Sequence, residues 1–131
     1  MLLAVVIAMF IAAKWWQRHR FNVQLRMARL SVDSLAELLD SGERPMIVDV
    51  RSAISREEGR IPGAILSTGR ELSPELVAHP KDALIVVYCA CPNDASAVAT
   101  ARQLLQHGFR DVRPLAGGID AWTAAGRALE T

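Results

Sequence analysis

The stretch "YCACPNDAS", residues 88–96, contains both cysteines of the chain, Cys89 and Cys91. A thiolate is a nucleophile and a metal ligand. The two cysteines are therefore compatible with four interpretations: a nucleophile in a loop, a redox pair, half of a metal site, or a plain turn. A metal site is the poorest of these interpretations, because two cysteines do not complete a zinc tetrahedron and the three histidines are scattered. We therefore expect no metal.

The segments around this stretch predict an α/β domain. Short apolar runs rich in β-branched residues indicate buried strands at residues 46–50, 83–88 and 111–115, with a brief extended piece ending at Ile65. Helical spacing and capping signals indicate helices within residues 31–40, 72–80, 95–106 and 117–126. Strands that alternate with helices favour a mostly parallel central sheet with helices on both faces.

Cys89 directly follows residues 83–88, the most strand-like segment, and a helix is expected from Ala95. Ligands of such sheets bind beyond the carboxyl ends of the strands. A loop that enters a helix directs backbone N–H groups and the positive end of the helix dipole to this place. We therefore expect a lowered pKa for the Cys89 thiol, which would make it a thiolate nucleophile. The alternative is a small buried hydrophobic residue at the end of a strand.

The amino-terminal segment has the pattern of a membrane helix. Residues 1–13 are apolar throughout, and Lys14, Trp15 and Trp16 follow them, as is typical of a membrane interface. A helix of ~13 residues rises only ~20 Å, against a hydrocarbon core of ~30 Å, so we interpret residues 1–16 as the end of a transmembrane helix. A signal peptide fits less well, because the positive charge follows the apolar run. A buried or oligomerising helix is the remaining alternative.

Residues 17–30 are basic and are expected to form a juxtamembrane helix or linker. By the positive-inside rule, the cations after the apolar run place the domain of residues 31–131 on the cytoplasmic side of the inner or cell membrane. A reducing compartment favours free thiols over a structural disulfide. The formal net charge of +1 predicts no nucleic-acid partner.

Five segments resemble the rhodanese-like sulfurtransferase domains in order and spacing, over residues 31–129. They are "IVDVRS" (47–52), "GRIPGAI" (59–65), "VVYC" (86–89), "GF" (108–109) and "LAGGIDAW" (115–122). The expected fold class is therefore α/β and rhodanese-like, with a central mostly parallel sheet, helices on both faces and an N-terminal membrane helix.

The resemblance also implies an activity for Cys89. Its thiolate would attack the sulfane sulfur of a small donor, thiosulfate or a persulfide, hold that sulfur as a persulfide and pass it to a thiol acceptor. No organic cofactor would be needed. The active-site loop would consist of Ala90, Cys91, Pro92, Asn93, Asp94, Ala95 and Ser96, with the amides of residues 90–95 around the persulfide.

The loop departs from the family pattern where the donor would bind. The usual loop has four residues between its cysteine and an arginine followed by serine, whereas here Ser96 comes one residue late and no arginine is present. Asp94 adds a negative charge, and Pro92 lacks an N–H. We therefore expect weak activity with thiosulfate and favour a persulfide, a neutral thiol donor or a protein partner. Asp94 has a structural alternative as the cap of the helix that begins at Ala95.

Three residues outside the loop are candidate substrate-binding or supporting residues. Asp49 and Arg51 follow the first strand and are expected near the same edge of the sheet, where Asp49 would brace loops through hydrogen bonds. Arg51 and Arg60 are the nearest candidates to replace the missing loop arginine.

Two other functions fit the same residues. The missing arginine and Asp94 are compatible with a binding or regulatory module that keeps the fold without turnover. Alternatively, Cys89 and Cys91 would form a strained, easily reduced disulfide as a thiol redox element. The phosphatase and arsenate reductase relatives of the fold match poorly, because they use the loop arginine to bind an oxyanion. Residues 28–42, after an apolar helix, also resemble bacterial membrane proteins of the DedA type that carry a rhodanese tail.

Overall fold

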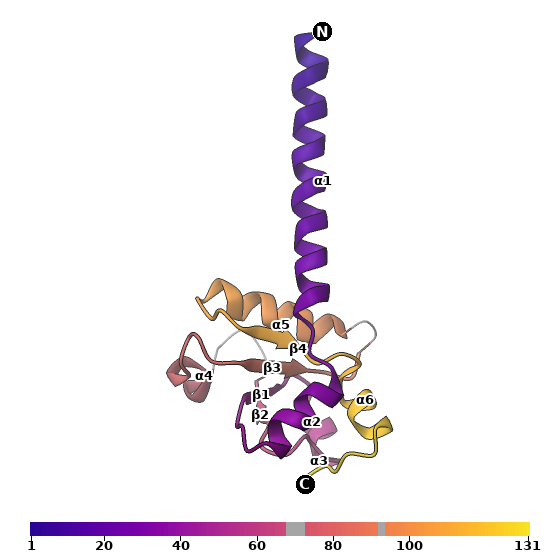
Figure 1. Ribbon diagram of the computed structural model, residues 1–131. Helices are drawn as coiled ribbons and strands as arrows, with labels where there is room; N and C mark the ends of the chain where they lie inside the picture. Colours follow the sequence, from indigo (N-terminus) through magenta and orange to yellow (C-terminus); the bar gives the residue numbers. More distant parts are fainter. Residues whose placement is uncertain (68–72, 92–93) are drawn as a thin grey trace.

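The computed structural model describes residues 1–67, 73–91 and 94–131, with the backbone alone for residues 19–28. The helices are α1 (Leu2–Ala28), α2 (Val32–Asp40), α3 (Ala53–Glu57), α4 (Pro74–Ala78), α5 (Ala95–Gln106) and α6 (Gly118–Ala124). The strands are β1 (Met46–Asp49), β2 (Ile65–Leu66), β3 (Ile85–Tyr88) and β4 (Val112–Pro114). Figure 1 shows the strands gathered near the foot of the long helix α1.

The four strands form one parallel sheet in the order β2-β1-β3-β4. The register pairs Asp49 with Tyr88, so β1 and β3 end level with one another. Every residue of β3 is buried, as expected for the central strand of a sheet that is covered on both faces. The predicted α/β architecture with a parallel central sheet is confirmed.

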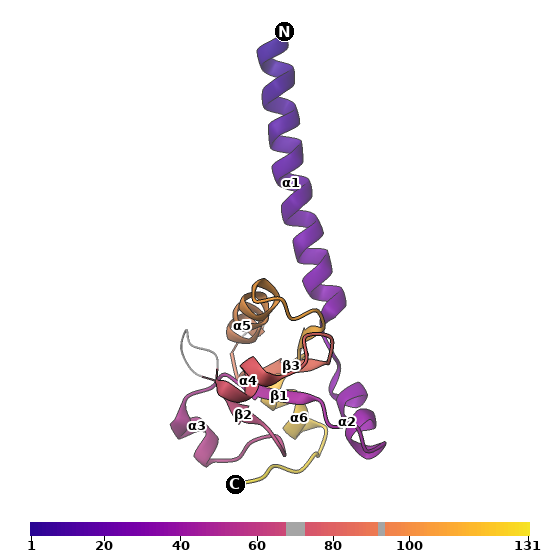
Figure 2. The same cartoon turned by 90° about the vertical axis from the view of Figure 1, so that its left-hand side faces the viewer.

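The side chains of β3 enter two cores in alternation. Val86 and Tyr88 belong to the core that includes residues of α2 and α6. Ile85 and Val87 belong to the core that includes residues of α4 and α5, and Cys89 lies in this second core. Figure 2 shows α5 and α2 on opposite sides of the sheet. Cys89 therefore continues the inward alternation of the strand that it follows.

Helix α1 projects away from the domain as a single helix of 27 residues (Figures 1 and 2). Its exposed large apolar side chains extend from Met1 to Trp16. Among the residues that the structure describes, no helix is both long and apolar enough to cross a membrane. The predicted transmembrane helix at residues 1–16 is therefore not supported, because its apolar run is short and continues without a break into the basic residues 17–28.

The chain after α1 is fixed to the edge of the sheet. The N–H of Leu30 donates to Pro114 O at 2.9 Å, and the N–H of Ala116 donates to Leu30 O at 2.8 Å. These bonds place Leu30 in a parallel bridge with Leu115 beyond the end of β4. The Leu30 side chain is also buried in the core, so the foot of α1 is part of the domain.

The short helix α3 was not among the predicted elements. The hydroxyl of Ser52 caps it by accepting the N–H of Ser55 at 3.3 Å. None of its residues is buried, and Ile54 is 77% exposed. A helix without a buried apolar stripe leaves no hydrophobic periodicity in the sequence, so only the capping serine could have indicated it.

Candidate active site

The start of the loop is held by the glycine turn before α6. Ile119 N–H donates to Cys89 O at 3.1 Å. Gly118 has a φ of +58°, and a Cβ added at this residue would collide with the carbonyl oxygen of Cys89. The sequence "GG" at residues 117–118 thus permits both the left-handed backbone and the close approach to the loop. The backbone of Cys89 is fixed from both sides, by β3 and by α6.

The Cys89 side chain is 3% exposed and packs in the core beneath α5. Burial raises the pKa of the Cys89 thiol, and its hydrogen bond with Cys91 raises the pKa further. Amide N–H groups of the loop and helix lower the pKa by less than these effects raise it. The predicted lowering of the Cys89 pKa is therefore wrong, because the alternation of β3 directs this side chain inward.

Cys91 has the opposite electrostatic environment. Its side chain is partly exposed, and its Sγ accepts the backbone N–H of Ser96 at 3.3 Å. Partial burial alone would raise the pKa of the Cys91 thiol, but hydrogen bonds from Cys89, Ser96 and the Ala97 N–H outweigh it and lower the pKa. The lowered thiol pKa is thus found at Cys91, whereas it had been predicted for Cys89.

Asp94 occupies the residue before α5 but does not cap this helix with its side chain. Its backbone is left-handed, with a φ of 55°, and its carboxylate accepts the N–H of Gly117 at 3.2 Å. Arg29 Nη1 lies 3.8 Å from the same carboxylate. The alternative of a capping role is therefore wrong, since the carboxylate faces Gly117 and Arg29, and these groups offset its negative charge.

Asp49 and Arg51 form a buried network at the carboxyl ends of β1 and β3. Arg51 Nε and Nη2 donate to Asp49 Oδ1 and Oδ2 at 3.1 and 2.8 Å, and the hydrogen bond with Asp49 raises the pKa of Arg51. The Tyr88 hydroxyl donates to Asp49 at 2.8 Å and accepts the Ile61 N–H at 3.2 Å. Burial raises the Tyr88 pKa, so this phenol stays protonated. Asp49 thus joins two strands and the segment before β2.

Neither Arg51 nor Arg60 is placed to substitute for a loop arginine. Arg51 also donates to Gly59 O at 2.7 Å, and its side chain is only 9% exposed. Arg60 pairs with Glu130 at 3.0 Å, and Glu130 accepts the Gly63 N–H at the same distance. The cation that the structure brings to the loop is instead Arg29, from the segment interpreted as a juxtamembrane linker.

The remaining loop residues are divided between exposed and undescribed positions. Ala90, Ala95 and Ser96 are exposed, with Ser96 contributing its N–H to Cys91. Pro92 and Asn93 lie outside the described residues.

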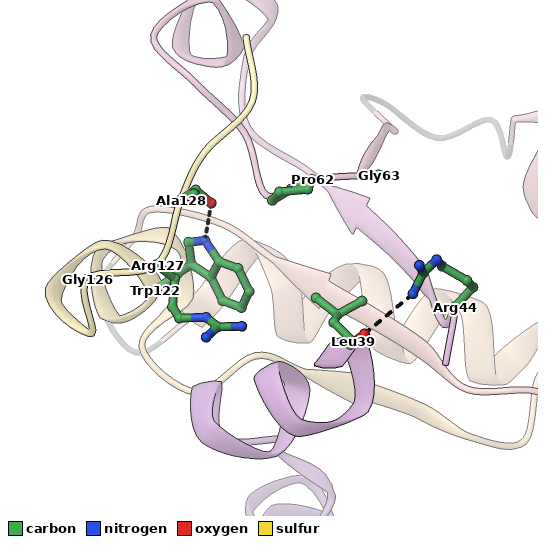
Figure 3. A pocket seen from close by; sticks show the side chains of 8 residues that line it. All are labelled: Leu39, Arg44, Pro62, Gly63, Trp122, Gly126, Arg127 and Ala128. Carbon is green, nitrogen blue, oxygen red and sulfur yellow. Dashed lines mark hydrogen bonds between the residues drawn. The ribbon is translucent and has the colours of Figure 1, made fainter. Parts of the chain in front are cut away.

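A separate concavity lies between α2, α6 and the chain end (Figure 3). Its volume is about 520 Å³, and none of the described residues of the loop, 89–91 and 94–96, lines it. In Figure 3 the guanidinium of Arg127 lies beside the Trp122 ring, at 5.5 Å from its centroid. Arg127 also pairs with Asp40 at 3.2 Å, so this cation is already engaged within the protein.

The family described as Rhodanese-like domain matches residues 31–125 of the chain. The chain belongs to this family. The resemblance to rhodanese-like domains inferred from five short motifs is thereby confirmed, whereas the resemblance to DedA-type proteins stays a prediction.

Relatives of this rhodanese-like chain carry sulfurtransferase names. Thiosulfate sulfurtransferase GlpE of Pseudoalteromonas translucida is 31% identical over 96 residues, which cover 73% of this chain and 89% of that protein. A sulfurtransferase of Allochromatium vinosum is 31% identical over 94 residues, covering 72% and 86%. The solution structure of a rhodanese-like domain from an Anabaena protein is similar with a TM-score of 0.68 at 30% identity, covering 78% of this chain and 77% of that one.

Replacement of Asp49 by asparagine should destabilise this rhodanese-like domain strongly. The variant leaves the buried Arg51 cation without its carboxylate, a loss that costs about 3–5 kcal/mol. Tyr88→Phe removes two hydrogen bonds, to Asp49 and from the Ile61 N–H, but leaves the Asp49–Arg51 ion pair intact, so it should cost less, about 1–3 kcal/mol. Urea unfolding of both variants measures the difference, and equal losses would contradict the network as described.

Gly118→Ala should destabilise the fold more than Gly126→Ala. Both glycines have a positive φ, +58° and +75°, so alanine costs about 1–2 kcal/mol at either position. A Cβ at Gly126 meets open space, whereas one at Gly118 meets the carbonyl of Cys89 and adds about 1–3 kcal/mol of overpacking. Thermal or urea unfolding tests this order, and a Gly118→Ala variant as stable as Gly126→Ala would disprove the close approach.

Proposed function

We propose that this rhodanese-like domain is a sulfurtransferase that carries sulfane sulfur as a persulfide on a thiol of the loop 89–96. The observation that supports it is the pair of thiols, Cys89 and Cys91, that directly follows the central strand β3 and precedes the 12-residue helix α5, whose Ser96 N–H donates to Cys91 Sγ at 3.3 Å. Relatives of the chain are named as sulfurtransferases, and a thiolate in this loop would have the nucleophilicity that the reaction needs. The family resemblance had assigned the carrier role to Cys89.

The reaction consists of two displacements at sulfur. The loop thiolate attacks the outer sulfur of the donor, the donor S–S bond breaks, and the donor leaves with the bonding electron pair as sulfite or a thiolate. The enzyme persulfide then loses the same sulfur to an attacking acceptor thiolate, which restores the loop thiolate. Neither step needs an oxidant, a reductant or a metal, because the total oxidation state of sulfur is conserved.

The preferred donor is a persulfide of a small thiol or of a protein, rather than thiosulfate. Thiosulfate is a dianion, and the two arginines expected to compensate for the missing loop arginine are engaged with Asp49 and Glu130. A persulfide carries less charge and depends less on a cationic partner. The relative named thiosulfate sulfurtransferase makes thiosulfate the essential comparison donor.

Incubation with a small persulfide should add one sulfur atom to the wild-type protein, and thiosulfate should add it more slowly. The double variant Cys89→Ser/Cys91→Ser should gain none, because it has no thiol. Intact mass spectrometry measures the gain, and treatment with excess thiol should remove it. Failure of the wild type to gain sulfur from either donor would favour a binding or regulatory module instead.

We also propose that the apolar part of α1 attaches the domain to a membrane, with the domain on the cytoplasmic side. Ten large apolar side chains between Leu2 and Trp16 are exposed, a surface that water solvates poorly. Lys14 and the aromatic pair Trp15 and Trp16 lie where the apolar run ends, as at a membrane interface.

Mixed phosphatidylcholine and phosphatidylglycerol vesicles should carry the wild-type protein to the top of a flotation gradient. The double variant Ile7→Lys/Ile11→Lys should stay at the bottom, because lysine at the centre of an inserted helix costs about 2.5–3.5 kcal/mol. Ile54→Lys, at an exposed isoleucine in α3 outside the apolar part of α1, is the control and should float. A wild-type protein that does not float would contradict membrane attachment.

A further inference from the structure

We propose that Arg29 and Asp94 are positioning residues for sulfur transfer, and that their ion pair makes the conformation of the loop 89–96 depend on the foot of α1. This role rests on the proposed sulfurtransferase function and concerns the loop that carries the sulfur. Neither side chain forms or breaks a bond in the two displacements at sulfur.

Asp94 fixes the end of the loop that leads into α5. Its N–H donates to Cys91 O at 3.2 Å and closes a turn of the chain. Its carboxylate accepts the N–H of Gly117 at 3.2 Å. The start of the loop is held at the same place, because Cys89 O accepts the N–H of Ile119 at 3.1 Å. Both ends of the loop are therefore attached to the start of α6.

The backbone of Asp94 adopts a conformation that has a cost. Its φ of 55° is left-handed, and among the described residues it is the only non-glycine residue with a positive φ. Aspartate tolerates this region better than most residues, but an extended or right-handed backbone is still favoured. Such conformations persist where the surrounding contacts fix them. We therefore expect the chain to leave this conformation when the carboxylate loses its partners.

The Asp94 carboxylate needs a cation because it is buried. Its side chain is only 7% exposed, and an ionised carboxylate that is removed from water is costly unless it is paired. Arg29 Nη1 lies 3.8 Å from Oδ2 of this carboxylate, and the Arg29 side chain is 33% exposed. Without this cation the carboxylate would favour solvent, and its hydrogen bond with the Gly117 N–H would be lost.

Arg29 is placed by the junction between α1 and the edge of the sheet (Figure 1). It directly follows the last residue of α1, and the next residue, Leu30, is buried. Leu30 donates to Pro114 O and accepts the N–H of Ala116, at 2.9 and 2.8 Å. The segment 114–119 thus binds the foot of α1 as well as both ends of the loop. A displacement of the foot of α1 would therefore reach the loop through this segment and through the ion pair.

A double-mutant cycle of sulfur loading tests the positioning role. Asp94→Asn keeps an acceptor for the Gly117 N–H but removes the charge, and Arg29→Gln removes the cation. Each change should lower the loading rate at saturating cysteine persulfide by roughly tenfold, since a misplaced reacting group can cost about 10²-fold. The double variant should be no slower than the slower single variant, because both changes break the same contact. Arg29→Lys keeps the charge and should restore most of the rate.

Arg127→Gln is the matched control for Arg29→Gln. The Arg127 side chain is 35% exposed and also pairs with an aspartate, Asp40, in a part of the domain that does not include the loop. This variant should load sulfur at the wild-type rate. A control that is as slow as Arg29→Gln, or losses that multiply in the double variant, would overturn the positioning role.

A comparison of two donors separates positioning from direct binding of the donor by Arg29. In Arg29→Gln the loading rate at saturation should fall by the same factor for thiosulfate and for cysteine persulfide, with little change in KM. A loss that appears mainly as a raised KM for the dianion thiosulfate would show that Arg29 binds the donor, and would overturn the positioning role.

Amide hydrogen exchange, measured by NMR, tests the coupling without any sulfur donor. Arg29→Gln should speed the exchange of the Gly117 N–H on the order of tenfold, as expected for one lost hydrogen bond. The Ala116 N–H, which donates to Leu30 O, is the internal reference and should exchange as in the wild type. Unchanged exchange at Gly117 would overturn the coupling and leave the sulfurtransferase function intact. A wild type that gains no sulfur would contradict the function, while the exchange result would still decide the coupling.

Discussion

The alternation of β3 between two cores is the constraint on which the site depends. A central strand covered on both faces must direct every second side chain into each core, and residue 89 continues the series of Ile85 and Val87 toward α5. Its carbonyl oxygen accepts the N–H of Ile119 and lies so close to Gly118 that a side chain at residue 118 would collide with it. The next thiol, Cys91, therefore becomes the one that meets the helix start and solvent. The packing of β3 against α5 thus determines that Cys89 is buried and that Cys91 is partly exposed.

Hydrophobic patterning was sufficient to predict the sheet and most of its helices. Residues 46–50 and 83–88 are apolar and β-branched enough to specify buried strands, and the spacing in residues 95–106 specifies a helix. The same alternation, counted one residue beyond Tyr88, would have indicated that Cys89 points inward. The prediction considered only that Cys89 follows the strand, and so it overlooked the burial that raises the pKa of the Cys89 thiol. The short helix α3 has no buried face, and for that reason the apolar pattern did not predict it.

The ion pairs could not be predicted, because they depend on tertiary placement. Arg60 pairs with the carboxylate of Glu130, which is 70 residues away in the sequence. Arg29 reaches Asp94 because the next residue, Leu30, forms a bridge with Leu115 beyond β4. Arg51 and Asp49 are neighbours in sequence, yet the contribution of Tyr88 from β3 shows that their pair is a structural brace. These arginines are each matched by a carboxylate. Among the described residues, a thiolate in this loop would therefore be stabilised mainly by main-chain N–H groups and by the neighbouring thiol. These groups suit a singly charged sulfur better than a dianion such as thiosulfate.

The continuity of α1 also sets a geometric limit on how far the domain can reach. Twenty-seven helical residues measure about 40 Å end to end, and the bonds of Leu30 to Pro114 and Ala116 join this rod to the sheet edge beside the cysteine loop. If residues 2–16 are held in a membrane as proposed, the helical residues 17–28 remain as a spacer of fixed length, about 18 Å, instead of a flexible tether. The length of this helix then limits how far from the anchored end a macromolecule can exchange sulfur with the cysteine loop. The tilt of α1 determines which side of the domain faces outward.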